Sequence, residues 1–157
     1  MAEQNNENTQ TKIEEVIREK LTGDAQKNAM DFVAFLRANE LTLTANSDGQ
    51  GWAVGGTVGN SIGYMWITGT EQFPGPWTFW FNSCDFGGNS ADDELKKFAW
   101  AHASPCGRCH PGWKDCGGGN RTMFGREFEN LCHSPLMFHN PDAETVQNMN
   151  KLMLMLT

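Results

Sequence analysis

The sequence predicts a single α+β domain in which helices flank an antiparallel sheet. Three observations predict this fold class. Apolar residues recur at helical spacing near both ends of the chain, and short β-prone runs alternate with glycine- and proline-rich turns in its middle. A chain of 157 residues is also long enough to bury one hydrophobic core. We expect a disordered tail over residues 1–10 and the domain over residues 11–157.

Two helices are expected in the N-terminal part of the chain. The first has apolar side chains three or four positions apart, at Ile13, Val16, Ile17 and Leu21. Gly23 breaks this pattern, and Asp24 can cap a second helix that runs to about Asn39. The apolar face of the second helix comprises Ala29, Phe32, Val33 and Leu36. Both helices are expected to pack on the elements that follow them.

The middle of the chain predicts an antiparallel meander of three or four strands. The β-prone runs are Thr42–Ser47, Gly51–Val58, Ile62–Thr68 and Trp77–Phe81. The dipeptide Gly59-Asn60 between two of the runs is a hairpin signal. The run Trp77–Phe81 is apolar on both faces, which is typical of a central strand or one covered by helices. One face of the preceding run carries Ile62, Tyr64 and Trp66.

Two more helices are expected further along the chain. Ser90 starts a Ser-x-x-Asp/Glu capping pattern, which predicts a helix to about Ala103. Near the C-terminus, Asn140 can serve as an N-cap and Pro141 as the first helical residue. This last helix should run to about Leu156, with an inward face of Val146, Met149, Met153 and Leu156.

Residues 106–132 carry the strongest chemical signal, a cysteine-rich segment that we expect to bind a metal ion. Cys106 and Cys109 form a C-x-x-C knuckle, which presents two thiolates to one ion. Cys116 lies beside a run of glycines, which lets the backbone fold closely around an ion. A following helical turn is expected to supply Cys132, because apolar residues there have helical spacing: Phe124, Phe128, Leu131 and Cys132.

Four sulfur ligands are typical of a closed tetrahedral zinc site, and an iron or iron–sulfur centre is the weaker alternative. His110 and His133 each follow a cysteine, so either could replace one sulfur ligand. The run Cys106–His110 also matches the c-type haem attachment pattern, but no export signal accompanies it, which argues against haem. The cysteines could instead be ordinary buried thiols, or the C-x-x-C pair could be a redox pair. Structural roles are expected for Cys84, His102 and His139.

Charge and motifs exclude several functions. A net charge of −7 disfavours broad binding to nucleic-acid phosphates. Apolar runs are too short to cross a bilayer, and the polar start of the chain predicts a cytoplasmic protein. Phosphate-loop, dinucleotide-binding, serine-hydrolase and zinc-protease motifs are absent from the sequence.

Six tryptophans could line a concave sheet surface that holds a small apolar or planar ligand, or they could simply fill the core. The apolar C-terminal stretch could pack within the domain, bind a partner helix, or form a homodimer.

The run Arg121–Cys132, followed by Phe138–Ala143, resembles the C-terminal signature of a family of small uncharacterised bacterial proteins with a C-terminal cysteine cluster. Segments similar to Ile17–Ala38, Trp77–Phe81 and Leu95–Trp100 precede that signature in its members. The resemblance implies no activity and therefore no catalytic residues. The sequence thus predicts a non-enzymatic, zinc-stabilised cytoplasmic module that binds a small ligand or a protein partner. The alternative is a thiol oxidoreductase or a metal-dependent enzyme that uses the C-x-x-C pair.

Overall fold

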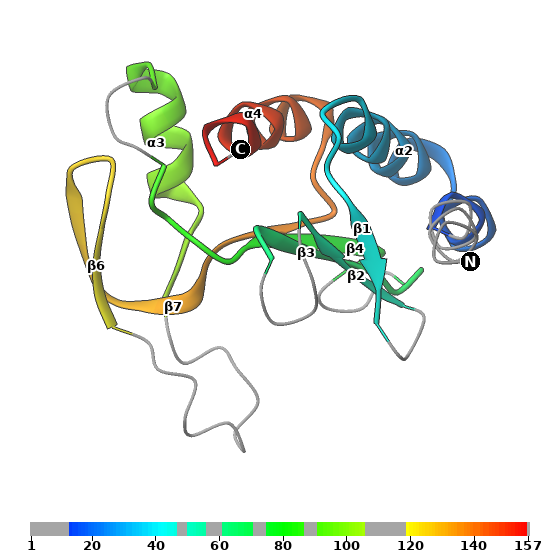
Figure 1. Ribbon diagram of the computed structural model, residues 1–157, viewed down its shortest axis with the longest axis horizontal. Coiled ribbons are helices and arrows are strands. Elements are labelled where there is room, and N and C mark those ends of the chain that lie inside the picture. The colour runs from blue at the N-terminus through cyan, green and yellow to red at the C-terminus, as the bar shows by residue number, and fades with distance from the viewer. Residues whose placement is uncertain are drawn as a thin grey trace.

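Helices cover one side of an antiparallel sheet in the computed structural model (Figure 1). The structure describes residues 13–46, 50–55, 61–70, 75–86, 91–105 and 119–156. Seven strands of this part of the chain form the sheet in the order β1-β2-β3-β4-β7-β5, with β6 paired to β7, and neighbouring strands are antiparallel. The α+β class predicted from the sequence is confirmed.

Two N-terminal helical segments are present as predicted. Residues 13–20 are helical, and α2 spans Gly23–Ala38. The expected cap at Asp24 is wrong, because Thr22 is the N-cap residue and Asp24 lies in the first turn. The expected stop is confirmed, since Asn39 is the C-cap and its Nδ2 donates to the Phe35 carbonyl at 2.9 Å. The buried face of α2 comprises Asn28, Ala29, Phe32, Val33 and Leu36.

The predicted meander is present, with shorter strands than the β-prone runs, but it is part of a seven-stranded sheet and not a sheet of three or four strands. Its strands are β1 (Leu43–Ala45), β2 (Gly51–Val54), β3 (Gly63–Ile67) and β4 (Trp77–Phe81). The expected turn at Gly59-Asn60 lies outside the described residues. As its apolar sequence predicts, β4 is an inner strand, paired with β3 on one side and with β7 on the other.

Strand alternation divides the sheet into two chemically different faces. The helix-covered face carries a fully buried row across three strands, Met65, Phe79 and Phe138. Phe32 of α2 packs on this row, with its ring centroid 4.9 Å from that of Phe79. The opposite face carries the adjacent row, Tyr64, Trp80 and Met137, whose side chains are only half-buried.

The helical turn expected around Cys132 is wrong, because this region is a β-hairpin. Strand β6 (Gly119–Met123) pairs with β7 (Arg126–His139). Phe124 and Gly125 form the two-residue connection, with φ of 49° and 80°. Positive φ at both positions is typical of the type I′ hairpin turn. A bulky residue rarely adopts this conformation, and here the Phe124 ring stacks on Phe86 at 5.2 Å.

A β-bulge explains why the sequence mimics a helix here. Arg121 pairs with Phe128 but Gly119 pairs with Leu131, so β7 contains one extra residue between the two pairs. Asn130 has a φ of 54° within this interval, and its N–H donates to Asn120 Oδ1 at 3.1 Å. The bulge brings Phe128 and Leu131 onto one face although they are three positions apart. That interval is also the one expected on a helix.

The helix α3 (Asp93–Ala101) is present, but its cap differs from the prediction. The N-cap is Asp92, whose carboxylate accepts from the Leu95 N–H at 2.8 Å, and Ser90 lies outside the described residues. The helix ends at His102, because the next residues form the short strand β5 (Ala103–Pro105).

The C-terminal helix α4 spans Ala143–Met155 and starts later than predicted. Asn140 is not its N-cap, because the Asn140 N–H donates to the Trp77 carbonyl at 2.8 Å and so extends the β4–β7 pairing. Asp142 caps the helix instead, and its Oδ1 accepts from the Thr145 N–H at 2.8 Å. The inward face is Val146, Met149, Leu152 and Met153, and Leu156 is only half-buried. Among the described helices, none is long and apolar enough to cross a membrane.

Replacing Asp142 by alanine is expected to cost about 1 kcal/mol of stability near neutral pH, because the helix loses its cap. Hydrogen bonds from the backbone and then the side chain of Thr145 lower the pKa of Asp142. The cap is therefore fully stabilising above the unfolded-state pKa of about 4. Its contribution is lost as the pH falls through the lower folded-state pKa. Urea titrations of the wild type and Asp142→Ala should show a smaller difference in the free energy of unfolding at strongly acidic pH than at pH 7. The Asp142→Asn variant should retain most of the cap at both pH values.

Candidate functional site

One of the four predicted metal ligands lies within the described part of the chain. Cys132 is on β7 and is 4 % exposed. It comes from a strand, not from the helical turn that its sequence spacing suggested. The other predicted ligands fall outside the described residues: Cys106, Cys109 and Cys116. His110 and the side chain of His133 are likewise outside them.

The two strands that flank the cysteine-rich segment meet at one residue of β7. Pro105, at the end of β5, pairs with Leu131, and Gly119, at the start of β6, pairs with the same residue. Leu131 directly precedes Cys132, and Pro105 directly precedes Cys106. Both ends of the segment are therefore anchored beside Cys132. Within the ranges described, His, Cys, Asp and Glu side chains form no group of three or more suited to a metal ion.

Cys84 is a buried thiol, as predicted. It is 8 % exposed, and its Sγ lies 3.9 Å from the Thr122 carbonyl. Burial raises the pKa of this thiol, and the nearby charge of Arg121 only partly opposes that effect. A raised pKa leaves little thiolate at neutral pH, so Cys84 is poorly suited to nucleophilic or redox chemistry.

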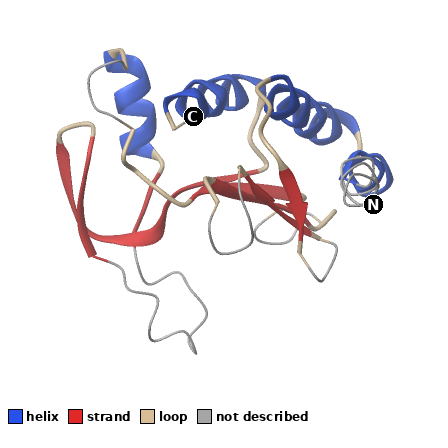
Figure 2. Cartoon of the chain, viewed as in Figure 1, coloured by secondary structure: helices blue, strands red, loops and turns tan. Residues whose placement is uncertain are grey.

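The described helices lie on one side of the sheet and leave its other face open (Figure 2). Three aromatic side chains form a row on that open face. The Tyr64 and Trp80 rings stack with centroids 4.8 Å apart and an interplanar angle of 27°. Trp66 meets Trp80 edge-on, at 6.4 Å and 78°. All three side chains are half-buried, so each keeps part of its surface in contact with solvent. We call Tyr64, Trp66 and Trp80 the aromatic row.

Local packing holds the aromatic row in place. The Tyr64 ring lies over Gly51, where a Cβ would overlap the phenol. Asn46 Nδ2 donates to the Tyr64 hydroxyl oxygen, and Asn46 Oδ1 accepts from the Gly51 N–H at 3.3 Å. Glycine at position 51 therefore allows the ring to lie flat across the neighbouring strand. The Tyr64 ring, on which Trp80 stacks, is therefore held in place by the protein itself.

A pocket of about 380 Å³ adjoins this face, between the end of β7, the C-terminal end of α3 and the start of α4. Met137 and His139 line it, and these residues pair with Trp80 and Thr78 on the open face. The pocket is completed by His102, Phe138, Asn140, Pro141, Asp142 and Thr145. Its volume falls in the range of small-molecule sites.

The two histidines of this pocket have structural contacts, as predicted. His102 Nδ1 lies 2.8 Å from the Phe98 carbonyl, and its ring packs on Phe138 at 5.0 Å. His139 Nδ1 lies 3.2 Å from Thr78 Oγ1. Sequence reasoning missed that both residues also line a pocket. Only the distant pairing of β4 with β7 and the packing of α3 bring these residues together, so no local sequence pattern could reveal the pocket.

Around the aromatic row, the described strand residues of the open face carry no charge. The residues of β1 to β4, and of β7 where it pairs with β4, that alternate onto this face include no Asp, Glu, Lys or Arg: Thr44, Gly51, Ala53, Tyr64, Trp66, Thr78, Trp80, Met137 and His139. The whole chain, in contrast, has a net charge of −7. This face therefore suits an uncharged ligand better than a phosphate-bearing or strongly basic one.

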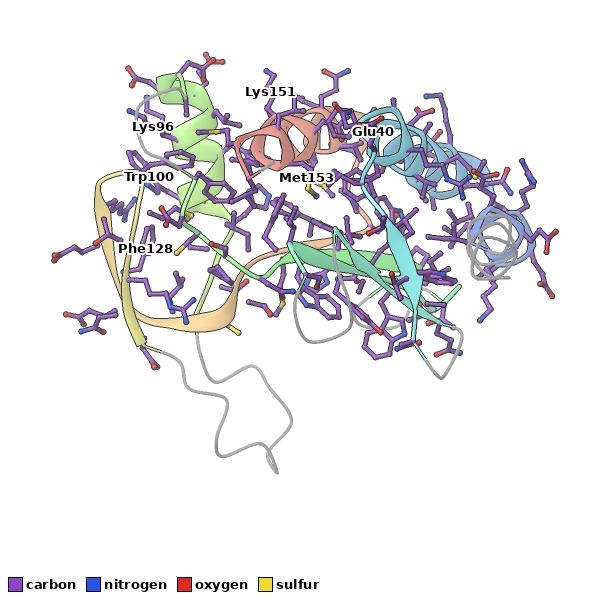
Figure 3. The ribbon with its side chains drawn as sticks, viewed as in Figure 1. Glu40, Lys96, Trp100, Phe128, Lys151 and Met153 are labelled. Atoms are coloured by element: carbon purple, nitrogen blue, oxygen red, sulfur yellow. The ribbon has the colours of Figure 1, made fainter. Side chains whose placement is uncertain are left out.

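A second cluster, in which Arg126 lies against the rings of Trp100 and Phe128, is on the helix-covered side of the sheet. It connects the β6–β7 hairpin with α3. Trp100 and Phe128 face each other across the space between α3 and β7 (Figure 3). The Arg126 guanidinium lies 5.8 Å from the Trp100 ring and 5.1 Å from the Phe128 ring. Trp100 Nε1 also donates to the Met123 carbonyl at 2.7 Å. These contacts give the cluster a structural role. A mutation in it is therefore a suitable control for mutations of the aromatic row on the open face.

No protein-family model matches the chain, and neither a curated protein nor a solved structure shows significant similarity to it.

Proposed function

We propose that the protein is a non-enzymatic binding module whose binding surface is the aromatic row and the adjoining pocket. The observation that carries this proposal is the ordered ring packing of Tyr64, Trp80 and Trp66 on a face without described helices. Aromatic rings are large apolar groups, and rings held in place before binding lose little conformational freedom when a ligand arrives. Gly51 and Asn46 supply that prior ordering.

The second part of the proposal is a zinc ion bound by Cys106, Cys109, Cys116 and Cys132. Support comes from the burial of Cys132 and from the anchoring of Pro105 and Gly119 on Leu131 beside it. A closed site with four thiolates has no open position for substrate, so the ion would stabilise the segment and perform no chemistry. Its binding energy would add directly to the folding energy of this part of the protein.

Mutation of Cys132 to serine is expected to remove zinc and to lower the melting temperature together. Purified wild-type protein should contain about one zinc per chain and show no visible colour. Cys84→Ser is the matched control, because Cys84 is also a buried free cysteine but lies outside the strands, after the end of β4. Elemental analysis and thermal unfolding of the three proteins provide the measurement.

Two results would contradict the zinc site. One is wild-type protein without metal, and the other is equal zinc in the wild type and in Cys132→Ser. Iron accompanied by charge-transfer bands in the visible spectrum would identify an iron–sulfur centre in place of zinc.

The binding function is tested with a panel of uncharged ligands, monitored by intrinsic tryptophan fluorescence. The panel contains neutral oligosaccharides and the planar apolar probe N-phenyl-1-naphthylamine. We expect at least one ligand to bind, and Trp80→Ala to weaken that binding about tenfold or more. Phe128→Ala, in the cluster on the helix side, should change it less than about twofold. A folded protein that binds no member of the panel would refute the proposed function.

A further inference from the structure

We propose that the ligand of the aromatic row is a neutral saccharide, an inference that rests on the proposed binding function. The first step concerns shape. The aromatic row is an open, half-buried surface and not a closed apolar cavity. A pyranose ring has a flat patch of C–H groups on one face and hydroxyls around its rim. Such a ring can lie on an aromatic face, whose negative quadrupole attracts the C–H groups, while its hydroxyls stay near water or polar side chains.

The second step concerns charge. Around the aromatic row, β1 to β4 and the part of β7 that pairs with β4 present no Asp, Glu, Lys or Arg on this face. A nucleotide or single-stranded nucleic acid would also stack on aromatic rings, but its phosphates require Lys or Arg beside the stacking platform. The carboxylate of Asp142, in the adjoining pocket, would repel an acidic sugar or another anion. Charge therefore favours a neutral occupant.

The third step concerns the polar groups around the rings. Asn46 meets the Tyr64 hydroxyl at one end of the aromatic row. Directly after the end of β4, Asn82 Nδ2 donates to Ser61 Oγ at 3.1 Å, and its Oδ1 accepts from Ser134 Oγ at 3.4 Å. Amide and hydroxyl groups can both donate and accept hydrogen bonds, which matches the neutral hydroxyls of a sugar.

The fourth step concerns the pocket that adjoins the row. His139 lines the pocket and pairs with Thr78 on the strand that carries Trp80, and the pocket continues to Asn140 and Asp142. Its lining thus combines hydroxyl, imidazole, amide and carboxylate groups within about 380 Å³. A saccharide chain stacked on the rings could place a further sugar unit here, where these groups can exchange hydrogen bonds with its hydroxyls.

A protein partner fits the same surface less well. Protein interfaces have a desolvated apolar centre, and among described large apolar side chains only Leu154, on α4 and 48 % exposed, is prominently exposed. The open face instead combines half-buried rings with polar side chains. That combination suits a ligand that is itself apolar on one face and polar at its rim.

Isothermal titration calorimetry on the full chain tests this inference with cellohexaose, chitohexaose and maltohexaose. At least one of them is expected to bind. Trp80→Ala should weaken the binding about tenfold or more, and Gly51→Ala, which displaces the Tyr64 ring, should also weaken it. Phe128→Ala should leave it within about twofold, and an oligogalacturonate should bind at least about tenfold more weakly than the best neutral sugar. Circular dichroism confirms that each variant is folded.

The outcomes separate this inference from the proposed function. If N-phenyl-1-naphthylamine binds in a Trp80-dependent manner and no neutral oligosaccharide does, the saccharide inference is wrong and the binding function stands. If the oligogalacturonate binds as tightly as the neutral sugars, the inference of a neutral ligand is wrong. If no ligand of any kind binds the folded wild-type protein, both the inference and the proposed function fail.

Discussion

Replacing Phe79 by alanine is expected to lower the free energy of unfolding by about 4 kcal/mol. Phe79 is fully buried at the middle of the sheet, on the helix-covered face of β4. Its ring contacts Phe32 of α2 and Phe81 of its own strand, each with centroids 4.9 Å apart. Truncation would therefore leave a cavity between the helix layer and the sheet, which the rigid strands on either side cannot close.

Chemical denaturation of the wild type and Phe79→Ala measures this loss, with the slope of the transition confirming two-state unfolding. Phe128→Ala is the matched control, because Phe128 is half-buried at the hairpin and its truncation should cost only about 1 kcal/mol. Equal losses in the two variants would show that Phe79 is not at the centre of the core.

Introducing a Cβ at Gly63 should be the second most damaging change, costing about 3 kcal/mol. Gly63 faces the core on β3, directly opposite Phe81. A Cβ there would overlap the end of the Phe79 ring and lie 2.7 Å from the Trp80 carbonyl oxygen. The ring could rotate, but the carbonyl belongs to the neighbouring strand, so the strands would have to separate.

Gly119→Ala is the control for this substitution. Gly119 also lies in a strand, yet a Cβ built on it meets no atom of the described residues within 4 Å. We expect Gly119→Ala to change stability by less than about 0.5 kcal/mol. Denaturation curves of the two variants should therefore differ clearly, and similar stabilities would contradict the close packing of β3 against β4.

Local signals predicted the N-terminal helices and the meander correctly. Asn39 stops α2 through a contact with Phe35, four residues away, so the necessary information is local. Trp77–Phe81 is apolar at almost every position, and only an inner strand can cover both faces of such a segment. For α2, the residues that determine where the helix ends are close together in the sequence. For β4, the apolar pattern itself indicates that both faces of the strand are buried.

The hairpin and the start of α4 were mispredicted because their causes are not local. The bulge near Asn130 depends on pairing with Asn120, and its effect on spacing imitates a helix. The sequence around Asn140 resembles a helix cap, but the Asn140 N–H donates to the carbonyl of Trp77, sixty-three positions earlier in the chain. A cap motif two residues later, at Asp142, then becomes the true start.

The tryptophans illustrate how far the candidate site could be predicted. Composition alone allowed either a ligand surface or a core, and the structure divides the residues between the two. Trp52 and Trp77 are fully buried, whereas Trp66 and Trp80 are half-buried on the open face. Strand alternation determines on which face of the sheet each tryptophan ring lies, so this division could be predicted once the strands were known. The strand pairing that brings Trp66 next to Trp80 could not be predicted from the sequence. The cysteine cluster stays a prediction, with Cys132 as its only described member.

The meeting of Pro105 and Gly119 at Leu131 also determines how freely the chain between them can change in length. The entropy lost on closing a flexible loop grows only with the logarithm of its length, so doubling such a loop costs about 0.6 kcal/mol. Insertions there would leave both anchors and the register of β7 untouched. The sheet thus sets where this segment begins and ends, whatever the number of residues between the two anchors.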